Sequence, residues 1–252
     1  MHTLVIDTSY GSTVGMVGHE PIVETDSRTH VERLQTNIAK AVERAGIQAN
    51  DIERIVVGVG PAPFTGLRAG IVAAKALAFA TGAQLVGQDV LTVQSQVHAG
   101  ERDGHVHLTL AVNDARRKQL YFTLVGSSVS GEFTTLVDMD IDYPSSIAAR
   151  VNEAVKTFSQ EGTLDCVVDV IGHGAAKYAG DWEAVEHLGT VDDRSLLDGG
   201  AAGLASFAAF ATRDDALENP RPVEPLYLRR PDVSVPNPLK HVLNHAGAER
   251  TE

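Results

Sequence analysis

The chain has 252 residues, a length that fits one large domain or two modest lobes. A chain this long buries enough surface to fold without disulfides or a structural metal. Its single cysteine, Cys166, excludes an intramolecular disulfide framework and a cysteine-based zinc cluster.

The charge is strongly acidic and unevenly distributed. The net charge is −12, and residues 1–100 hold 7 basic and 9 acidic side chains whereas residues 101–252 hold 14 and 24. Because affinity for nucleic acid depends on neutralising phosphates, this composition argues against a protein that binds RNA unaided. The N-terminal apolar run is short and reaches Asp7, so we predict neither a signal peptide nor a membrane anchor, and a cytoplasmic location.

The first hundred residues begin with three expected strands joined by tight turns, which predict an antiparallel meander: residues 3–8, 13–17 and 22–25. A helix follows, because Val31, Leu34 and Ile38 recur at intervals of three to four residues. Gly46 is placed to end that helix. The β-branched run at residues 55–59 then predicts a strand buried on both faces.

The second expected helix, at about residues 66–81, is apolar on every side. Arg68 and Lys75 are its only charged residues between Leu67 and Ala80. A helix of this composition is typically covered all round. It is therefore either the central core helix of one domain or, in part, an interface with another body. We expect its length and its two cations to exclude a membrane span.

The rest of the chain repeats the alternation of strands and helices. A short helix is expected at 90–97, and the other expected elements are strands at 108–113, 120–125, 133–137 and 167–171 and helices at 145–160 and 201–212. Two successive blocks of strands and helices predict an α/β protein. We expect an N-terminal lobe at 1–100, a C-terminal lobe at 101–230 and an irregular tail at 231–252.

Polar residues at the end of the first strand form one candidate site. Asp7, Thr8 and Ser9 precede a hairpin that contains Gly11. A carboxylate and hydroxyls there suit Mg²⁺ bound through water, with backbone N–H groups facing phosphate. The same residues also suit the plain task of satisfying turn backbone groups.

The loop at residues 60–66 lies between a strand and a helix, a place where loops hold phosphate. It lacks the Walker spacing, and Pro61 and Pro63 remove two backbone donors, so a rigid turn is favoured. Arg116 and Arg117, in the basic turn 114–118, are candidates for a nucleotide phosphate or for an ordinary solvated hairpin.

No metal or catalytic site is predicted. The pairs His241/His245 and His105/His107 have suitable spacings, but neither has a third ligand nearby in the sequence. Cys166 opens a buried-looking strand, and no serine lies in a Gly-x-Ser-x-Gly elbow.

Several segments, in order along residues 3–230, resemble the bacterial TsaB (YeaZ) family. They are residues 4–9, His30, the block 57–70 with its Gly-Pro-x-x-Phe-Thr-Gly-Leu-Arg pattern, residues 85–87, residues 114–117 with Tyr121, and residues 225–229. Ala62 and Pro63 depart from the Gly-Ser that is usual in the family. The resemblance implies a two-lobed actin/Hsp70/sugar-kinase-like fold with mixed sheets flanked by helices.

The resemblance also implies a function. TsaB is the non-catalytic partner of TsaD, which forms N6-threonylcarbamoyladenosine at position 37 of tRNA, and an ATPase, TsaE, joins the pair. TsaD holds its metal with a His-x3-His pair after a Leu-Val-Gly-like strand. Along this chain the pair falls near Val90 and Gln94, which cannot replace histidine ligands.

By the same resemblance, the two helices of the first lobe are expected to contact a TsaD-like transferase. The candidate contacts are Val31, Leu34, Ile38, Leu67, Ile71 and Ala74, with Arg68 and Lys75 as cationic or rim positions. An Ile71→Asp variant is expected to weaken that complex. No cofactor is required, although ATP or ADP at the partner interface and a homodimer through the same helices are compatible with this scheme.

The competing hypothesis is an enzyme of the same superfamily, a Mg-nucleotide hydrolase or kinase. It would use Asp7 and the loop at residues 60–66.

Overall fold

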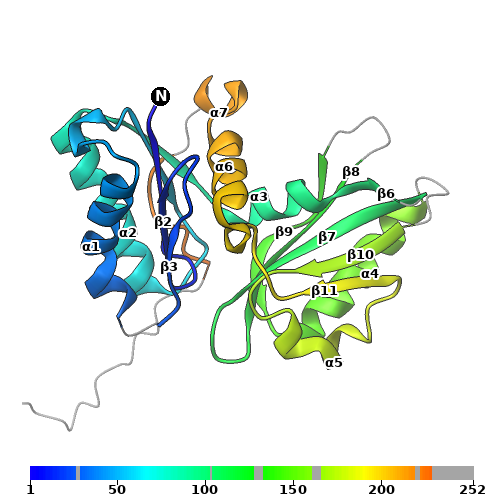
Figure 1. Cartoon of the computed structure of the whole chain (residues 1–252). Helices are drawn as coiled ribbons and strands as arrows, with labels where there is room; N and C mark the ends of the chain where they lie inside the picture. Colours follow the sequence, from blue (N-terminus) through cyan, green and yellow to red (C-terminus); the bar gives the residue numbers. More distant parts are fainter. Residues whose placement is uncertain (27–28, 103, 128–132, 161–165, 219–221, 229–252) are drawn as a thin grey trace, which may run out of the picture.

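The computed structural model describes residues 1–26, 29–102, 104–127, 133–160, 166–218 and 222–228. The pair His241/His245 and the expected tail 231–252 lie outside these residues. The described chain folds into two lobes, each built on one mixed β-sheet (Figure 1). The first sheet has the strand order β3-β2-β1-β4-β5 and the second β11-β10-β7-β8-β9, with β6 paired to β7.

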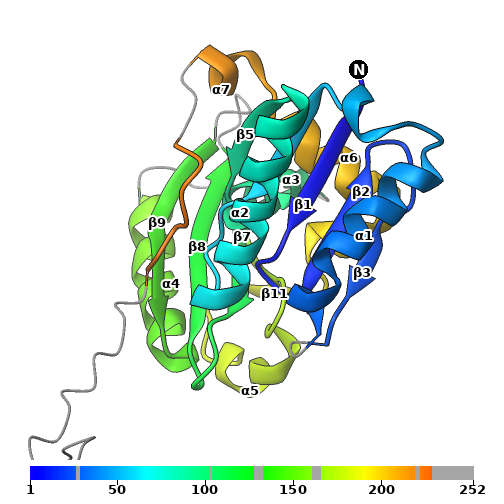
Figure 2. The ribbon, with the colours of Figure 1, turned by 90° about the vertical axis from the view of Figure 1, so that its left-hand side faces the viewer.

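The first lobe confirms the expected meander and the buried central strand. Its strands are β1 (Thr3–Asp7), β2 (Ser12–Met16), β3 (Ile22–Glu24), β4 (Arg54–Gly58) and β5 (Gln84–Gln88). The first three pair antiparallel, whereas β4 runs parallel to both β1 and β5. Helices α1 (His30–Arg44) and α2 (Phe64–Thr81) lie side by side over the outer face of this sheet (Figure 2).

The second lobe contains the later strands, in the order expected, and two short strands that the sequence did not reveal, residues 100–102 and 188–192. Its strands are β6 (Gly100–Arg102), β7 (His105–Asp114), β8 (Leu120–Ser127), β9 (Phe133–Asp142), β10 (Cys166–Ile171) and β11 (Leu188–Asp192). Strands β7, β8 and β9 pair antiparallel, and β10 and β11 add in parallel. The edge strand β11 was missed because it is short, only partly buried and carries a glycine.

The remaining helices are α3 (Val90–His98), α4 (Pro144–Gln160), α5 (Ala179–Trp182), α6 (Gly200–Ala211) and α7 (Asp214–Glu218), with short 3₁₀ turns η1 (Ala49–Asp51), η2 (Ala176–Tyr178) and η3 (Leu196–Gly199). Helix α6 follows the second sheet in sequence but returns to the first. Its Leu204 and Phe207 pack with Val5 and Val56, so α6 covers the inner face of the first sheet, between the lobes (Figure 1).

Helix α2 is buried on one side only, so of the two alternatives it is not the core helix covered all round within one domain. Its inward residues include Leu67, Ile71 and Ala74, while Val72 is 64% and Phe79 93% exposed. The helix has 18 residues and a mean hydropathy of 1.2, so length and composition alone do not exclude a membrane span, contrary to our expectation. In the structure it packs on β4 and α1 as a helix of the first lobe.

Two glycines of the block 57–70 are explained by close packing. A Cβ at Gly58 would overlap the carboxylate of Asp7, and a Cβ at Gly70 would overlap the hydroxyl of Thr8. Only glycine lets β4 and α2 approach the end of β1 this closely. The glycines therefore seat Asp7 and Thr8 rather than cradle a phosphate.

We expect Gly58→Ala to lower the free energy of unfolding by about 1–3 kcal/mol, because the added methyl group overlaps Asp7 in a packed interior. Chemical denaturation followed by circular dichroism measures the change. Gly180→Ala is the matched control, since no atom lies within 4 Å of its Cβ position, and it should be near neutral. Equal stabilities of the two variants would contradict this packing argument.

Candidate functional site

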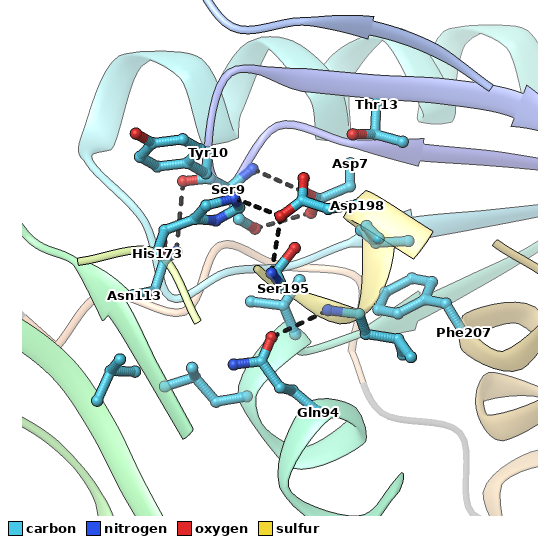
Figure 3. A pocket seen from close by; sticks show the side chains of 15 residues that line it. Asp7, Ser9, Tyr10, Thr13, Gln94, Asn113, His173, Ser195, Asp198 and Phe207 are labelled. Atoms are coloured by element: carbon cyan, nitrogen blue, oxygen red, sulfur yellow. Dashed lines mark hydrogen bonds and ion pairs between the residues drawn. The ribbon is translucent and has the colours of Figure 1, made fainter. Parts of the chain in front are cut away.

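Polar side chains from both lobes converge on the cleft between the sheets. Asp7 ends β1, Asn113 lies near the end of β7, and His173 lies two residues after the end of β10. The carboxyl ends of parallel strands are where open α/β sheets bind ligands. This cleft is therefore the first candidate site, and Figure 3 shows its side chains.

The imidazole of His173 connects the two lobes. It stacks on the ring of Tyr10 in the β1–β2 hairpin, with 3.7 Å between ring centroids and 14° between planes. Its Nε2 lies 2.8 Å from Oδ2 of Asp198, in the turn η3 that leads into α6 (Figure 3). Burial raises the pKa of Asp198, but the hydrogen bond and charge of His173 and the bonds from Ser195 hold that pKa below its ordinary value.

The carboxylate of Asp7 is turned toward its own hairpin. It accepts hydrogen bonds from the Ser9 hydroxyl at 2.7 Å and from the Ser9 backbone N–H at 3.1 Å. Burial raises the pKa of Asp7, and the Ser9 bonds and the charge of His173 oppose that shift only in part. A carboxyl group held this way favours its neutral form more than an exposed aspartate does.

Two amide side chains complete the connection between the lobes. Gln94 in α3 donates from Nε2 to the Ile171 carbonyl at 2.5 Å and accepts from the Leu196 N–H at 3.2 Å. Asn113 donates from Nδ2 to the Pro61 carbonyl at 3.2 Å. What remains of the cleft is a cavity of about 30 Å³, which is room for about one water molecule.

The acidic and histidine side chains of the cleft have partners within the protein, Asp7 with Ser9 and His173 with Asp198. In the described part of the chain, no group of three or more His, Cys, Asp or Glu side chains is placed to hold a metal ion. The side chain of Val90 has no atom that can bind a metal, and the amide of Gln94 is hydrogen-bonded to backbone groups, so neither residue replaces a histidine ligand. His107 pairs with Asp169, its Nδ1 lying 2.6 Å from the carboxylate.

A second, larger groove of about 670 Å³ lies between the hairpin tip and the start of α2. Of the candidate nucleotide residues, Thr8, Ser9 and Arg116 line it, while Asp7 lies in the cleft and Arg117 lines neither space. The groove also carries the acidic side chains of Glu32 and Asp114. Ser9 lines both the cleft and the groove, so the candidate residues are spread over two adjoining spaces.

Five candidate partner contacts are unavailable at the surface, because the first lobe buries them in its own core: Leu34, Ile38, Leu67, Ile71 and Ala74. Val31 is half-buried and lines the larger groove, and Arg68 and Lys75 are exposed. Sequence reasoning missed Val72 and Phe79, which share the outward face of α2 with the two cations. The spacing of 68, 72, 75 and 79 marks one stripe of a helix and was the signal available.

The two lobes, each a mixed sheet flanked by helices, have the actin/Hsp70/sugar-kinase-like fold that was expected. The structure of YeaZ from Pseudomonas aeruginosa shares this fold, with a TM-score of 0.63 and 24% identity over 90% of this chain and 99% of that one.

Residues 21–231 match the family described as TsaD: tRNA N6-adenosine threonylcarbamoyltransferase, and the chain belongs to this family. The TsaB-like (YeaZ) resemblance stated from the motifs is confirmed by these findings. The match links the chain to tRNA threonylcarbamoyladenosine modification.

Two relatives differ in how much of this chain they match. An uncharacterized protein of Mycobacterium tuberculosis is 29% identical over 239 residues, which cover 91% of this chain and 92% of that protein. The tRNA N6-adenosine threonylcarbamoyltransferase of Geobacillus thermodenitrificans is 33% identical over 119 residues, which cover 47% of this chain but only 30% of the transferase.

We expect Asp198→Asn to destabilise the protein in a pH-dependent way. Because the pKa of Asp198 is lowered on folding, its stabilising contribution is present above the ordinary value of 3.8 and is lost as the pH falls through the folded-state value. Unfolding by urea should therefore show a difference from the wild type at about pH 5–6 that shrinks below about pH 4. The exposed Asp138→Asn is the control, and a difference that ignores pH would contradict the prediction.

Proposed function

We propose that this protein is a non-catalytic scaffold that binds a TsaD-like transferase through the outward face of α1 and α2. The single observation that carries the proposal is the exposed apolar stripe on α2, where Phe79 is 93% and Val72 64% accessible. Large apolar side chains exposed together on a helix mark interaction surfaces. Membership of the threonylcarbamoyltransferase family supports the choice of partner.

The energetics of this face favour association. Covering a phenylalanine and a valine buries apolar surface at about 25 cal/mol per Å², which amounts to a few kcal/mol before entropic costs. Arg68 and Lys75 alternate with these residues along the stripe, in the order Arg68, Val72, Lys75, Phe79, and add positive charge to the same face.

The filled cleft supports a role without turnover. Its side chains bind one another across the lobes, and about 30 Å³ of space remains. We therefore infer that transfer to tRNA is performed by the partner and that tRNA reaches this chain only within the complex. The net charge of −12 agrees with this inference, because acidic surfaces repel phosphates.

The remaining parts of the assembly are proposals as well. A TsaE-like ATPase would join the pair, and a homodimer through α1 and α2 would compete with the transferase for the same face. We keep the cytoplasmic location as a prediction, together with the absence of any required cofactor.

We expect Phe79→Asp to abolish or strongly weaken the complex without changing the melting temperature, because Phe79 is exposed in the isolated protein. Ile71→Asp should instead destabilise the first lobe, since Ile71 is 3% exposed and a buried unpaired carboxylate is costly. This replaces the expectation that Ile71 itself contacts the partner. Size-exclusion chromatography with the transferase and thermal denaturation separate the two effects. Persistent co-elution of Phe79→Asp at wild-type affinity would contradict the proposal.

The alternative, a Mg-nucleotide hydrolase or kinase, depends on the larger groove, whose volume of about 670 Å³ is within the range of ligand pockets. If the chain is a scaffold, we expect titration calorimetry of the isolated chain with Mg-ATP to give no heat above that of dilution. Heat that disappears in Arg116→Ala would place a nucleotide in the groove, and heat that disappears in Asp7→Ala would place it in the cleft. Either of these results, together with hydrolysis or phosphoryl transfer from ATP by the isolated chain, would favour the alternative.

A further inference from the structure

An aromatic and cationic cluster lies at the start of α2, beside the apolar stripe. The rings of Phe64 and Tyr227 stack with 4.6 Å between centroids and 22° between planes. The guanidinium carbon of Arg68 lies 3.7 Å from the centroid of Phe64. Arg68 also donates a hydrogen bond from Nε to the hydroxyl of Tyr227 at 2.5 Å.

The third member of this cluster is held in place by a segment far along the chain. Tyr227 belongs to residues 222–228, a segment that lies in space beside the residue after the end of β4, Val59. Leu226 donates from its N–H to the Val59 carbonyl at 2.8 Å, and Val223 packs on the core of the first lobe. Leu228 packs on Leu91 and its neighbours from the second lobe. The position of Tyr227, and through it of Arg68, is therefore fixed by both lobes.

This arrangement leaves one edge of the Arg68 guanidinium available. Its face rests on Phe64 and its Nε is taken by Tyr227, while within the described part of the chain no acceptor bonds the two terminal Nη groups. Two parallel Nη–H donors in a fixed plane match the two oxygens of a carboxylate. Because the side chain is already held, binding costs little further ordering.

We propose that Arg68, held by its contact with the Phe64 ring and its hydrogen bond to Tyr227, is a specificity anchor that pairs with a carboxylate side chain of the protein docking on α2. This inference rests on the proposed function. It adds that the docking protein carries a carboxylate where it contacts Arg68. Charge complementarity supports it: α2 carries two cations and no acidic residue in a chain with 33 acidic and 21 basic residues. A protein carboxylate is favoured over an RNA phosphate because Val72 and Phe79 extend the same exposed face with apolar surface.

The experiment measures the affinity of the full chain for the family's transferase by biolayer interferometry at low and high salt. Arg68→Ala should weaken binding about tenfold or more and flatten the salt dependence, because a charge pair that becomes buried in an interface contributes strongly. Arg68→Lys should not restore affinity, since lysine lacks the fork. Tyr227→Phe keeps the stacked ring but loses the hydrogen bond to Arg68, and should show a smaller loss.

Two controls make the result interpretable. Lys156→Ala removes an exposed cation from α4 of the second lobe, with the same change in net charge, and should bind like the wild type. Melting temperatures should stay unchanged in Arg68→Ala and Tyr227→Phe within the range of exposed substitutions.

The outcomes separate this inference from the proposed function. Wild-type affinity in Arg68→Ala, with the transferase still bound, would overturn the inference and leave the scaffold proposal intact. Loss of tRNA binding by the assembled complex without any loss of transferase affinity would assign Arg68 to RNA and also overturn it. Failure of the wild type to bind the transferase would overturn both.

Discussion

The two lobes are joined by side chains that satisfy each other across the cleft. His173 bridges Tyr10 and Asp198, while Gln94 and Asn113 bond backbone carbonyls on opposite sides. Buried polar groups are costly unless they are hydrogen-bonded, so these contacts fix how the lobes meet. In this fold the same edge of the sheets is where a ligand is expected, and here the chain's own side chains occupy it. The relation of the lobes and the small size of the remaining cavity, about 30 Å³, follow from one set of bonds.

Helix α2 has one face in the core of the first lobe and the opposite face exposed at the surface. Its inner side fills the first core through Leu67, Ile71 and Ala74, and Gly70 lets it approach Thr8. Its outer side exposes Val72 and Phe79 together with the two cations, Arg68 and Lys75. A helix that is apolar on both sides but covered on only one favours a second polypeptide as its cover. The segment 222–228 adds Tyr227 to that face, so the end of the described chain contributes to the surface that we assign to a partner.

Most of the fold could be predicted from local patterns, because the strands and helices carry clear periodicity. The β-branched run of β4 and the stripe of α1 identified their elements correctly, whereas β11 and the return of α6 to the first sheet could not be found locally. The residues of the candidate site were harder to predict from the sequence than the strands and helices. Asp7 and Ser9 were recognised, but His173 and Asp198 lie far apart from them in sequence and carry no motif, so only folding brings them together. For α2 the composition indicated an apolar helix, but because apolar residues occur on every side, the sequence could not show which side faces the core.

Hydroxyl-radical footprinting of side chains, with and without the transferase, tests most directly whether the outer face of α2 is the docking surface. Phe79 is 93% exposed and Tyr143, in the second lobe, is 53% exposed and serves as an internal reference. We predict that the partner strongly lowers oxidation of Phe79 and leaves Tyr143 unchanged. Unchanged oxidation of Phe79 in a complex that has demonstrably formed would contradict the account, because the transferase would then dock elsewhere.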